Sequence, residues 1–177
     1  MSAQRKVVFI SSKSPTLHLL CGKIASGKST LATTLAGVDG AVVIAEDTWL
    51  NALYSDQLSS ISDYVRCAAK LRDVMGPHVA SLLNEGISVV LDFQANTIEA
   101  RSWMRGILEQ TKASHKLHVL DVSDEICIAR LRARNAAGDH PFAPTEDQFS
   151  QLSKHFNLPA QDEGFDVVMH KTGDADQ

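Results

Sequence analysis

The sequence predicts a single three-layer α/β/α domain, in which helices cover both faces of a parallel β-sheet. Three observations support this fold class. Short apolar runs alternate with longer segments of helical spacing, which is the pattern of repeated strand–helix–strand units. Two of the runs, VVIA within 41–45 and SVVL within 88–93, are almost continuously apolar, as expected of strands covered on both faces. The length of 177 residues fits one domain.

The first elements are two strands separated by a helix. Residues 16–21 form the first strand, and residues 28–36 form a helix that is expected to end at Gly37. The β-branched run at 41–45 fits a buried second strand.

The segment between the second and third strands is expected to hold two helices. Apolar residues from Ile61 to Leu71 follow helical spacing. Gly76 and Pro77 are expected to break this helix, because proline removes a backbone donor and clashes with the preceding turn. Pro77 also fits the first turn of a following helix, which runs to Asn84.

The rest of the domain continues the alternation. In order, we expect a strand at 88–93, a helix at 97–110, a strand at 116–122, a helix from 123 or 124 through 134, a helix from 145 to near 156, and a strand at 165–169. Thr145 and Gln148 form a capping-box pattern at the start of the last helix. Residues 135–144 are expected to form a loop, which is a candidate lid. The domain is expected to span residues 15–170. Residues 1–14 are predicted to be an extension that is loose or adds a strand, and residues 171–177 a disordered tail.

Composition excludes several classes of protein. Hydrophobic residues make up 44% of the chain, which is enough for a core and excludes wholesale disorder. Lys and Arg number 17 against 21 Asp and Glu, so binding to nucleic acid through overall charge is disfavoured, although a local basic groove stays open. No apolar run approaches the roughly 18–20 residues of a membrane helix, and no signal-peptide pattern is present.

The three cysteines, Cys21, Cys67 and Cys127, are odd in number and widely spaced. A disulfide framework or a zinc site is therefore not expected. Each cysteine is predicted to be a small buried apolar residue, and the setting is expected to be the reducing cytoplasm.

The most specific motif is a phosphate-binding loop at 22–29. GKIASGKS fits the pattern G-x-x-x-x-G-K-[ST] without a mismatch, between a predicted strand and a predicted helix. Gly22 and Gly27 allow the backbone N–H groups to point inward, and the helix N-terminus favours anions. Lys28 is expected to reach the β- and γ-phosphates of ATP, and the Ser29 hydroxyl to bind Mg²⁺. The predicted nucleotide contacts in the loop are Gly22, Lys23, Ala25, Ser26, Gly27, Lys28 and Ser29.

Carboxylates at the ends of two strands are candidates for metal binding and catalysis. Asp92 follows the apolar run of the third strand and is expected to hold Mg²⁺, directly or through water. Glu46 and Asp47 follow the second strand, at the edge where ligands bind in parallel α/β sheets. We favour Asp47 as the base that accepts the hydroxyl proton, with Asp92 as the alternative base and a helix cap as the ordinary role of Asp47.

Basic and polar side chains could complete the site. Arg130 and Arg134 are four residues apart on one helix face, just before the candidate lid, and are expected to stabilise phosphate charge. Solvated arginines at a helix end are the alternative. Asn96 and Arg101 follow the third strand and are candidate substrate contacts, against ordinary surface polarity.

A phosphate-binding loop serves GTPases, ATPase motors and kinases. The sequence lacks an N-K-x-D motif for reading guanine, and a motor is usually larger than 177 residues. A small phosphotransferase therefore fits best.

Four segments resemble the bacterial small ATP-binding proteins of the AAA-type P-loop kinase family: TLHLLCGKIASGKSTLA, EDTWL, VVLDFQANTIEAR and RLRARNAAGDHPFAPTEDQF. That family is similar to zeta toxins, chloramphenicol phosphotransferase and the kinase domains of polynucleotide 5′-kinases. The likeness runs from about Thr16 to Met169. It implies the strand order 2-3-1-4-5, ATP contacts that include Thr30, a base at Asp47 and lid arginines at 130 and 134.

These observations together predict an ATP-dependent kinase that uses Mg²⁺ and phosphorylates a hydroxyl group of a small molecule. The first alternative is a kinase of polynucleotide or RNA 5′-hydroxyl ends, which would need a basic groove. The second is a nucleotide-sensing regulatory module that transfers no phosphate. The lid is short for a nucleoside-monophosphate kinase, and no sugar-nucleotide pocket of the zeta-toxin kind is evident.

Overall fold

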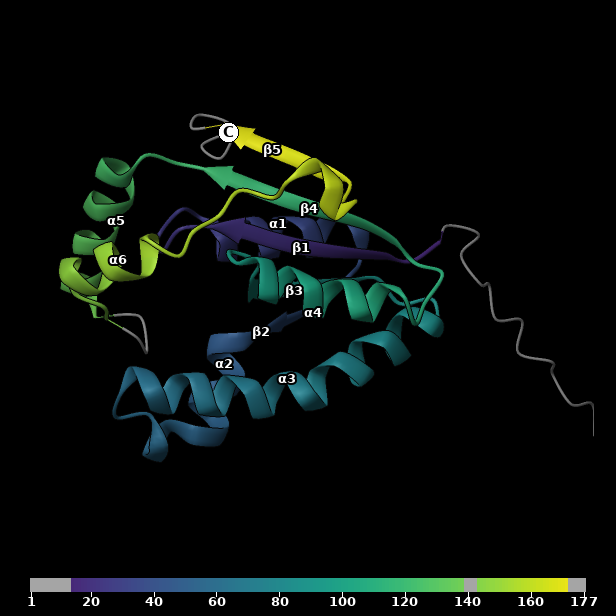
Figure 1. Ribbon diagram of the computed structural model, residues 1–177, viewed down its shortest axis with the longest axis horizontal. Helices are drawn as coiled ribbons and strands as arrows, with labels where there is room; N and C mark the ends of the chain where they lie inside the picture. Colours follow the sequence, from purple (N-terminus) through teal and green to yellow (C-terminus); the bar gives the residue numbers. More distant parts are fainter. Residues whose placement is uncertain (1–13, 139–142, 172–177) are drawn as a thin grey trace, which may run out of the picture.

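A parallel five-stranded sheet forms the centre of the molecule (Figure 1). The computed structural model describes residues 14–138 and 143–171. Within them the strand order is β2-β3-β1-β4-β5, which confirms the predicted order. The strands are β1 Thr16–Gly22, β2 Val42–Ala45, β3 Val89–Gln94, β4 Ser114–Asp121 and β5 Val167–Lys171. The predicted extension at 1–14, apart from its last residue, the centre of the predicted lid and nearly all of the predicted tail lie outside the described residues.

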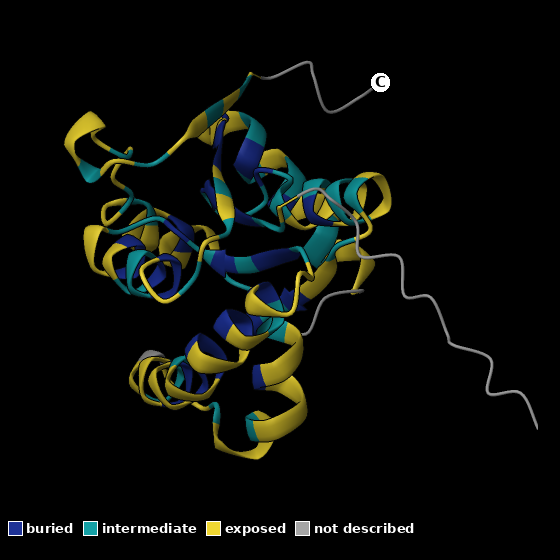
Figure 2. Cartoon of the chain, turned by 90° about the vertical axis from the view of Figure 1, so that its right-hand side faces the viewer, coloured by how far each residue is buried: buried dark blue, intermediate teal, exposed yellow. Residues whose placement is uncertain are grey.

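Helices pack on both faces of the sheet, as predicted (Figures 1 and 2). They are α1 Lys28–Asp39, α2 Glu46–Tyr54, α3 Ile61–Asn84, α4 Ile98–Leu108, α5 Asp124–Ala137 and α6 Glu146–Ser153. Successive strand residues point to opposite faces. Leu19 accordingly packs in the main core with α3 and α4, whereas Leu20 packs with Ala32 of α1 on the other face. The capping box predicted at Thr145 is present at the start of α6.

The predicted break at Gly76 and Pro77 is wrong, because α3 is one continuous helix from residue 61 to residue 84. Its apolar stripe continues in register across the proline, and Leu71, Met75 and Val79 are all buried. Gly76 packs closely against α4, since a Cβ atom there would lie 3.4 Å from Nε1 of Trp103. Packing of the apolar stripe therefore outweighs the local helix-breaking tendency.

Two further predictions near β2 are corrected. Helix α1 passes through Gly37 and ends at Asp39, and the next residue, Gly40, has a φ of 63° and provides the left-handed C-cap. β2 is an edge strand of the sheet, and its Val42 and Val43 are 42% and 41% exposed. The β-branched run therefore forms a strand, but the expected burial on both faces is not found.

All three cysteines lie among the described residues, and each is buried, as predicted; none of them forms a disulfide there. No helix in the described part of the chain is long and apolar enough to cross a membrane.

Three histidines form a hydrogen-bonded row across β1, β4 and β5. His18 Nδ1 lies 3.0 Å from His118 Nε2, and His118 Nδ1 lies 2.9 Å from His170 Nε2. At the inner end of the row, His18 Nε2 lies 3.1 Å from the Asp39 carboxylate of α1. Burial, together with the neighbouring His18 and His170 rings, lowers the pKa of His118 to about 4. His118, at the centre of the row, is therefore expected to be uncharged at neutral pH.

Candidate active site

The carboxyl ends of β1, β2 and β3 lie next to each other, at the end of the sheet that faces α2 and α5 (Figure 1). Gly22 ends β1, and α2 begins directly after Ala45 of β2. Asp92 of β3 pairs in register with Ala45. The topology therefore brings together the phosphate-binding motif and the three carboxylates that the sequence singled out, Glu46, Asp47 and Asp92.

The loop at 22–29 is tightly folded. Ala25 and Gly27 have φ values of 59° and 107°, and the Ser26 N–H donates to the Lys23 carbonyl at 3.2 Å. A Cβ atom on Gly22 would lie 2.6 Å from Ser26 Oγ, so only glycine fits there without a shift. Ser26 is buried, and its Oγ has no hydrogen-bond partner among the described residues. A concave backbone with a buried hydroxyl awaiting a partner fits an anionic ligand.

The side chain of Lys28 folds back onto this loop. Its Nζ donates to the carbonyl oxygens of Gly22 and Lys23, both at 2.7 Å. Burial lowers the pKa of Lys28, and the carboxylates of Asp92 and Asp47 act in the opposite direction, Asp92 more strongly. The lysine thus stands between the loop carbonyls and the two carboxylates that were predicted to serve metal binding and catalysis.

The two predicted metal ligands are Asp92 and Ser29. Asp92 is half-buried within β3, two residues before the strand ends at Gln94, and Ser29 is exposed in the first turn of α1. No group of three or more His, Cys, Asp or Glu side chains gathers around a metal position in the described ranges. A cation here would have to draw other oxygen ligands from water or from a bound phosphate, which is how proteins commonly hold Mg²⁺.

Glu46 and Asp47 are neighbours in sequence but have different environments. Glu46 is buried and accepts hydrogen bonds from Arg72 Nη2 at 3.1 Å and from the Tyr64 hydroxyl at 3.3 Å. Burial raises the pKa of Glu46, and Arg72 opposes this shift. Asp47 is half-buried, and its charge acts on Lys28 and Arg134. Glu46 therefore anchors α2 to α3, and Asp47 is the carboxylate on the side of the phosphate loop.

Helix α5 brings basic side chains to the loop. Arg130 Nη1 donates to the Ser26 carbonyl at 3.3 Å. Arg134 is half-buried; burial lowers its pKa while Asp47 raises it, and its Nε has no hydrogen-bond partner in the described part of the chain. Lys23 donates to Asp124 at the start of α5 at 2.5 Å. The loop and the helix that carries the arginines are thus linked at two points.

Arg101, one of the two predicted substrate contacts, does not face solvent. It is fully buried, and its Nε and Nη2 atoms pair with the Glu163 carboxylate at 2.6 and 2.8 Å. Its Nη1 donates to the carbonyls of Ala95 and Asn157 at 3.0 and 2.8 Å. A guanidinium group bonded in this way to four protein acceptors is in a structural environment, which does not favour the predicted contact with substrate.

Asn96 also contacts protein, at the first residue of the phosphate loop. Its Oδ1 accepts from the Gly22 N–H at 2.8 Å, and its Nδ2 donates to the Gly22 carbonyl at 2.9 Å. Sequence reasoning missed this pairing because the two residues are 74 positions apart. It also missed the Glu46–Arg72 pair, for the same reason.

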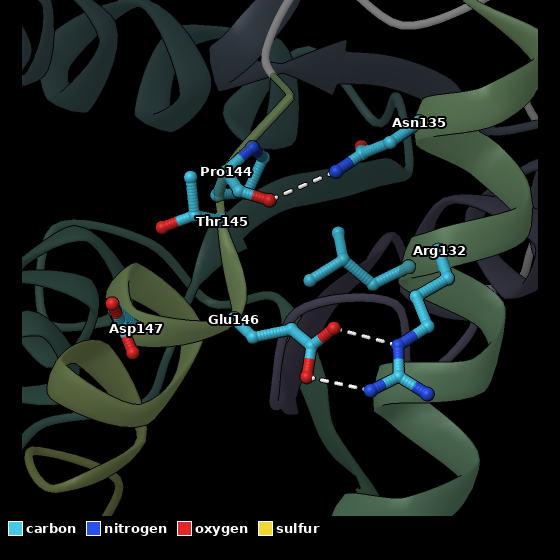
Figure 3. A pocket seen from close by; sticks show the side chains of 7 residues that line it. Arg132, Asn135, Pro144, Thr145, Glu146 and Asp147 are labelled. Carbon is cyan, nitrogen blue, oxygen red and sulfur yellow. Dashed lines mark hydrogen bonds and ion pairs between the residues drawn. The ribbon is translucent and has the colours of Figure 1, made fainter.

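A separate pocket of about 420 Å³ lies between α5 and the start of α6 (Figure 3). Arg132 lines it and pairs with Glu146 at 2.6 and 2.8 Å, and Asn135 Nδ2 donates to the Pro144 carbonyl at 2.9 Å. These contacts join the two ends of the predicted lid. Arg132 thus serves a different surface from Arg130, as the helical spacing predicts.

Comparison with known proteins identifies a family and a shared fold. A family model described as an AAA domain matches residues 17–159. No curated protein matches the chain.

Several solved structures share the fold. A candidate kinase from Chloroflexus aurantiacus superposes with a TM-score of 0.75 and 17% identity, over 94% of this chain and 90% of that one. Kti12 from Chaetomium thermophilum, in complex with ADP-AlF3, gives 0.69 and 14%, over 89% and 90%. The APS kinase CysC from Mycobacterium tuberculosis, in complex with AMPPNP and APS, gives 0.60 and 19%, over 90% of each chain.

Proposed function

The chain belongs to the AAA-domain family, and from this membership and the site geometry we propose that it is an ATP-dependent kinase acting on a hydroxyl group of a small molecule. One observation carries the proposal. Lys28 donates to the carbonyls of a complete phosphate-binding loop, while the carboxylates of Asp92 in β3 and of Asp47 at the start of α2 act on its charge. Phosphoryl transfer requires a loop that holds the phosphates, a cationic side chain such as lysine, and carboxylates for the metal ion and for the acceptor hydroxyl.

ATP fits the loop on two observations. The buried Ser26 hydroxyl has no partner among the described residues, and the space beside Gly22 is closed to any side chain. Both features leave the loop interior to inward-pointing backbone donors. The neighbours solved with ADP-AlF3 and AMPPNP support a nucleotide ligand for this fold.

Mg²⁺, when bound, would neutralise part of the charge of the phosphates. In this proposal the Ser29 hydroxyl and the Asp92 carboxylate would hold the ion, Asp92 directly or through water. Both groups offer the oxygen donors that Mg²⁺ prefers.

In the proposed reaction, the acceptor oxygen forms a bond to the γ-phosphorus while the bond from that phosphorus to the β,γ-bridging oxygen breaks. Asp47 takes the proton from the acceptor hydroxyl. Lys28 and the guanidinium groups of Arg130 and Arg134 stabilise the negative charge on the transferring group and on the departing ADP.

The residue assignment is tested by single-turnover transfer from Mg-ATP to the best acceptor, in Asp47→Asn and Lys28→Ala. We expect Asp47→Asn to bind Mg-ATP normally but to transfer phosphate about 10²- to 10⁴-fold more slowly. Lys28→Ala should lose both binding and transfer. Asp56→Asn is the matched control, because Asp56 is an exposed acid in the turn after α2. Near-normal transfer by Asp47→Asn, with none by Lys28→Ala, would make Asp92 the candidate base.

A further inference from the structure

Four side chains in contact, which we call the α2–β3 bridge, connect α2 to β3 through α3 and α4. Glu46 of α2 accepts hydrogen bonds from Nη2 and Nε of Arg72 in α3, at 3.1 and 3.3 Å. The Arg72 guanidinium lies over the ring of Trp103 in α4, 5.7 Å from the ring centroid. Trp103 in turn stacks on Phe93 of β3, with ring centroids 5.6 Å apart. The bridge thus links these elements through side chains, in addition to the backbone pairing of the strands.

The two ends of the bridge lie next to the two carboxylates of the proposed reaction. Glu46 precedes Asp47 in the first turn of α2, and Phe93 follows Asp92 in β3. Successive residues of a strand point to opposite faces. Phe93 accordingly packs in the main core, while the charge of Asp92 acts on Lys28 of α1. The bridge therefore lies behind the site and fixes the residues from which its carboxylates project.

We infer that Arg72 is a positioning residue for phosphoryl transfer, because it holds Glu46 and thereby directs Asp47 toward the acceptor hydroxyl. This inference rests on the proposed function, in which Asp47 is the base. It gives a role in the reaction to a residue that lies in α3, outside the phosphate-binding loop and outside the helix that carries the other arginines of the site.

Helix α2 has few other contacts that fix its direction. It has nine residues, and a helix of that length is marginal without packing. Its N-cap residue, Ala45, makes no side-chain hydrogen bond, and of the nine residues, all of them described, only Glu46 and Leu50 are buried. The pairing of Ala45 with Asp92 sets where α2 begins. The direction in which the helix leaves the sheet therefore depends on Glu46, the buried residue of its first turn.

Arg72 supplies most of what holds Glu46. The Glu46 carboxylate accepts three side-chain hydrogen bonds within the described part of the chain, two from Arg72 and one from Tyr64 at 3.3 Å. Burial raises the pKa of Glu46, and the charge of Arg72 is the largest influence in the opposite direction. Removal of the guanidinium group therefore deletes two hydrogen bonds and favours the uncharged acid, so that the first turn of α2 loses its main anchor.

The first test is amide hydrogen exchange of the full chain without ligand. In Arg72→Met, the α2 amides should gain about tenfold in exchange rate relative to those of β3. Arg72→Lys keeps the charge but lacks the planar fork, so the gain should be about threefold, and this milder variant decides the matter if Arg72→Met does not fold. Arg66→Met is the matched control and should exchange like the wild type, because Arg66 is exposed on the same helix and pairs with Asp63. Unchanged exchange of α2 in both Arg72 variants would overturn the inference.

The second test is single-turnover phosphate transfer from Mg-ATP, at a temperature at which every variant is folded. The acceptor is the compound, among aminoglycosides, chloramphenicol, nucleosides and sugar nucleotides, that most stimulates ADP release by the wild type. Misplacement of a reacting group by about 1 Å can cost about 10²-fold in rate. Since Leu50 and the strand pairing still hold α2 in part, we expect Arg72→Met to transfer about tenfold and Arg72→Lys about threefold more slowly. The half-saturating concentration of Mg-ATP should stay within about twofold of the wild-type value.

A double-mutant cycle separates positioning from a general effect on the fold. In an Asp47→Asn background no base is left to misplace, so adding Arg72→Met should slow transfer by less than about twofold. An equal loss of about tenfold in both backgrounds would show that Arg72 only maintains the fold, and would refute its role in positioning the base.

The two proposals fail in different ways. If the wild type transfers phosphate to none of these acceptors, the proposed function is refuted and the role of Arg72 in the reaction with it. If the wild type transfers phosphate and Asp47→Asn does not, but Arg72→Met and Arg72→Lys transfer like the wild type, only the role of Arg72 is refuted.

Discussion

Replacement of Arg101 by methionine tests whether this buried arginine holds the fold together or contacts the substrate. The substitution keeps most of the apolar stem and removes the guanidinium group. It deletes two hydrogen bonds to the Glu163 carboxylate and one to each of the carbonyls of Ala95 and Asn157. These contacts join the start of α4 to the segment that precedes β5.

The expected loss of stability follows from the groups left behind. The Glu163 side chain is 18% exposed and can recover part of its hydrogen bonding from water. The substitution removes the arginine donor from the Ala95 carbonyl. Because Ala95 is fully buried, water cannot replace that donor, and the loss costs about 1–3 kcal/mol. Breaking a buried ion pair by removing one partner costs about 3–5 kcal/mol. Since Glu163 is partly solvated, we expect the free energy of unfolding to fall by about 3 kcal/mol, a large share of a typical 5–15 kcal/mol.

Urea denaturation of the wild type, Arg101→Met and Arg66→Met measures this loss. Arg66 is 46% exposed and pairs with Asp63 on the surface of α3, so its removal should change stability by less than about 1 kcal/mol. A free energy of unfolding unchanged in Arg101→Met, together with a raised KM for the acceptor, would show that the structural reasoning is wrong and that Arg101 contacts substrate.

Three further predictions concern the loop, the histidine row and the anchor of α2. Gly22→Ala places a Cβ atom 2.6 Å from Ser26 Oγ, so calorimetry should show Mg-ADP affinity reduced more than tenfold; normal affinity would contradict the loop geometry. His118 has a pKa of about 4 in the folded protein, below the 6.5 of an ordinary histidine, so the unfolded chain binds more protons between these pH values. Stability should therefore fall by up to about 3 kcal/mol as pH decreases through this window, and urea titrations of His118→Phe should lack that part of the slope. Glu46→Gln leaves Arg72 without its carboxylate and should lower the free energy of unfolding by about 3 kcal/mol. An unchanged free energy of unfolding in urea denaturation would contradict this prediction.

Features set by neighbouring residues were predictable from the sequence. The strand–helix alternation and the capping box at Thr145 depend on short patterns, and the structure has both. The phosphate-loop motif likewise specifies its own turn, with glycine at the positions that need it. The strand order came from the family resemblance, and the structure confirms it.

Features set by distant residues were not predictable. The continuity of α3 through Gly76 depends on packing against Trp103, and the burial of Arg101 depends on Glu163, 62 positions away. The different environments of Glu46 and its neighbour likewise depend on Arg72, 26 positions further along the chain. A single sequence contains each residue of these pairs but not the contact between them.

The central claim is that the chain transfers phosphate from ATP, and acceptor-stimulated ADP release tests it most directly. The assay compares the wild type with Lys28→Ala in Mg-ATP, across aminoglycosides, chloramphenicol, nucleosides, sugar nucleotides and a 5′-hydroxyl oligonucleotide. We predict that one small-molecule class stimulates ADP release by the wild type and not by Lys28→Ala. Tight ATP binding with no stimulation by any class would contradict the kinase assignment and favour a nucleotide-sensing role, whereas stimulation by the oligonucleotide alone would contradict the small-molecule acceptor.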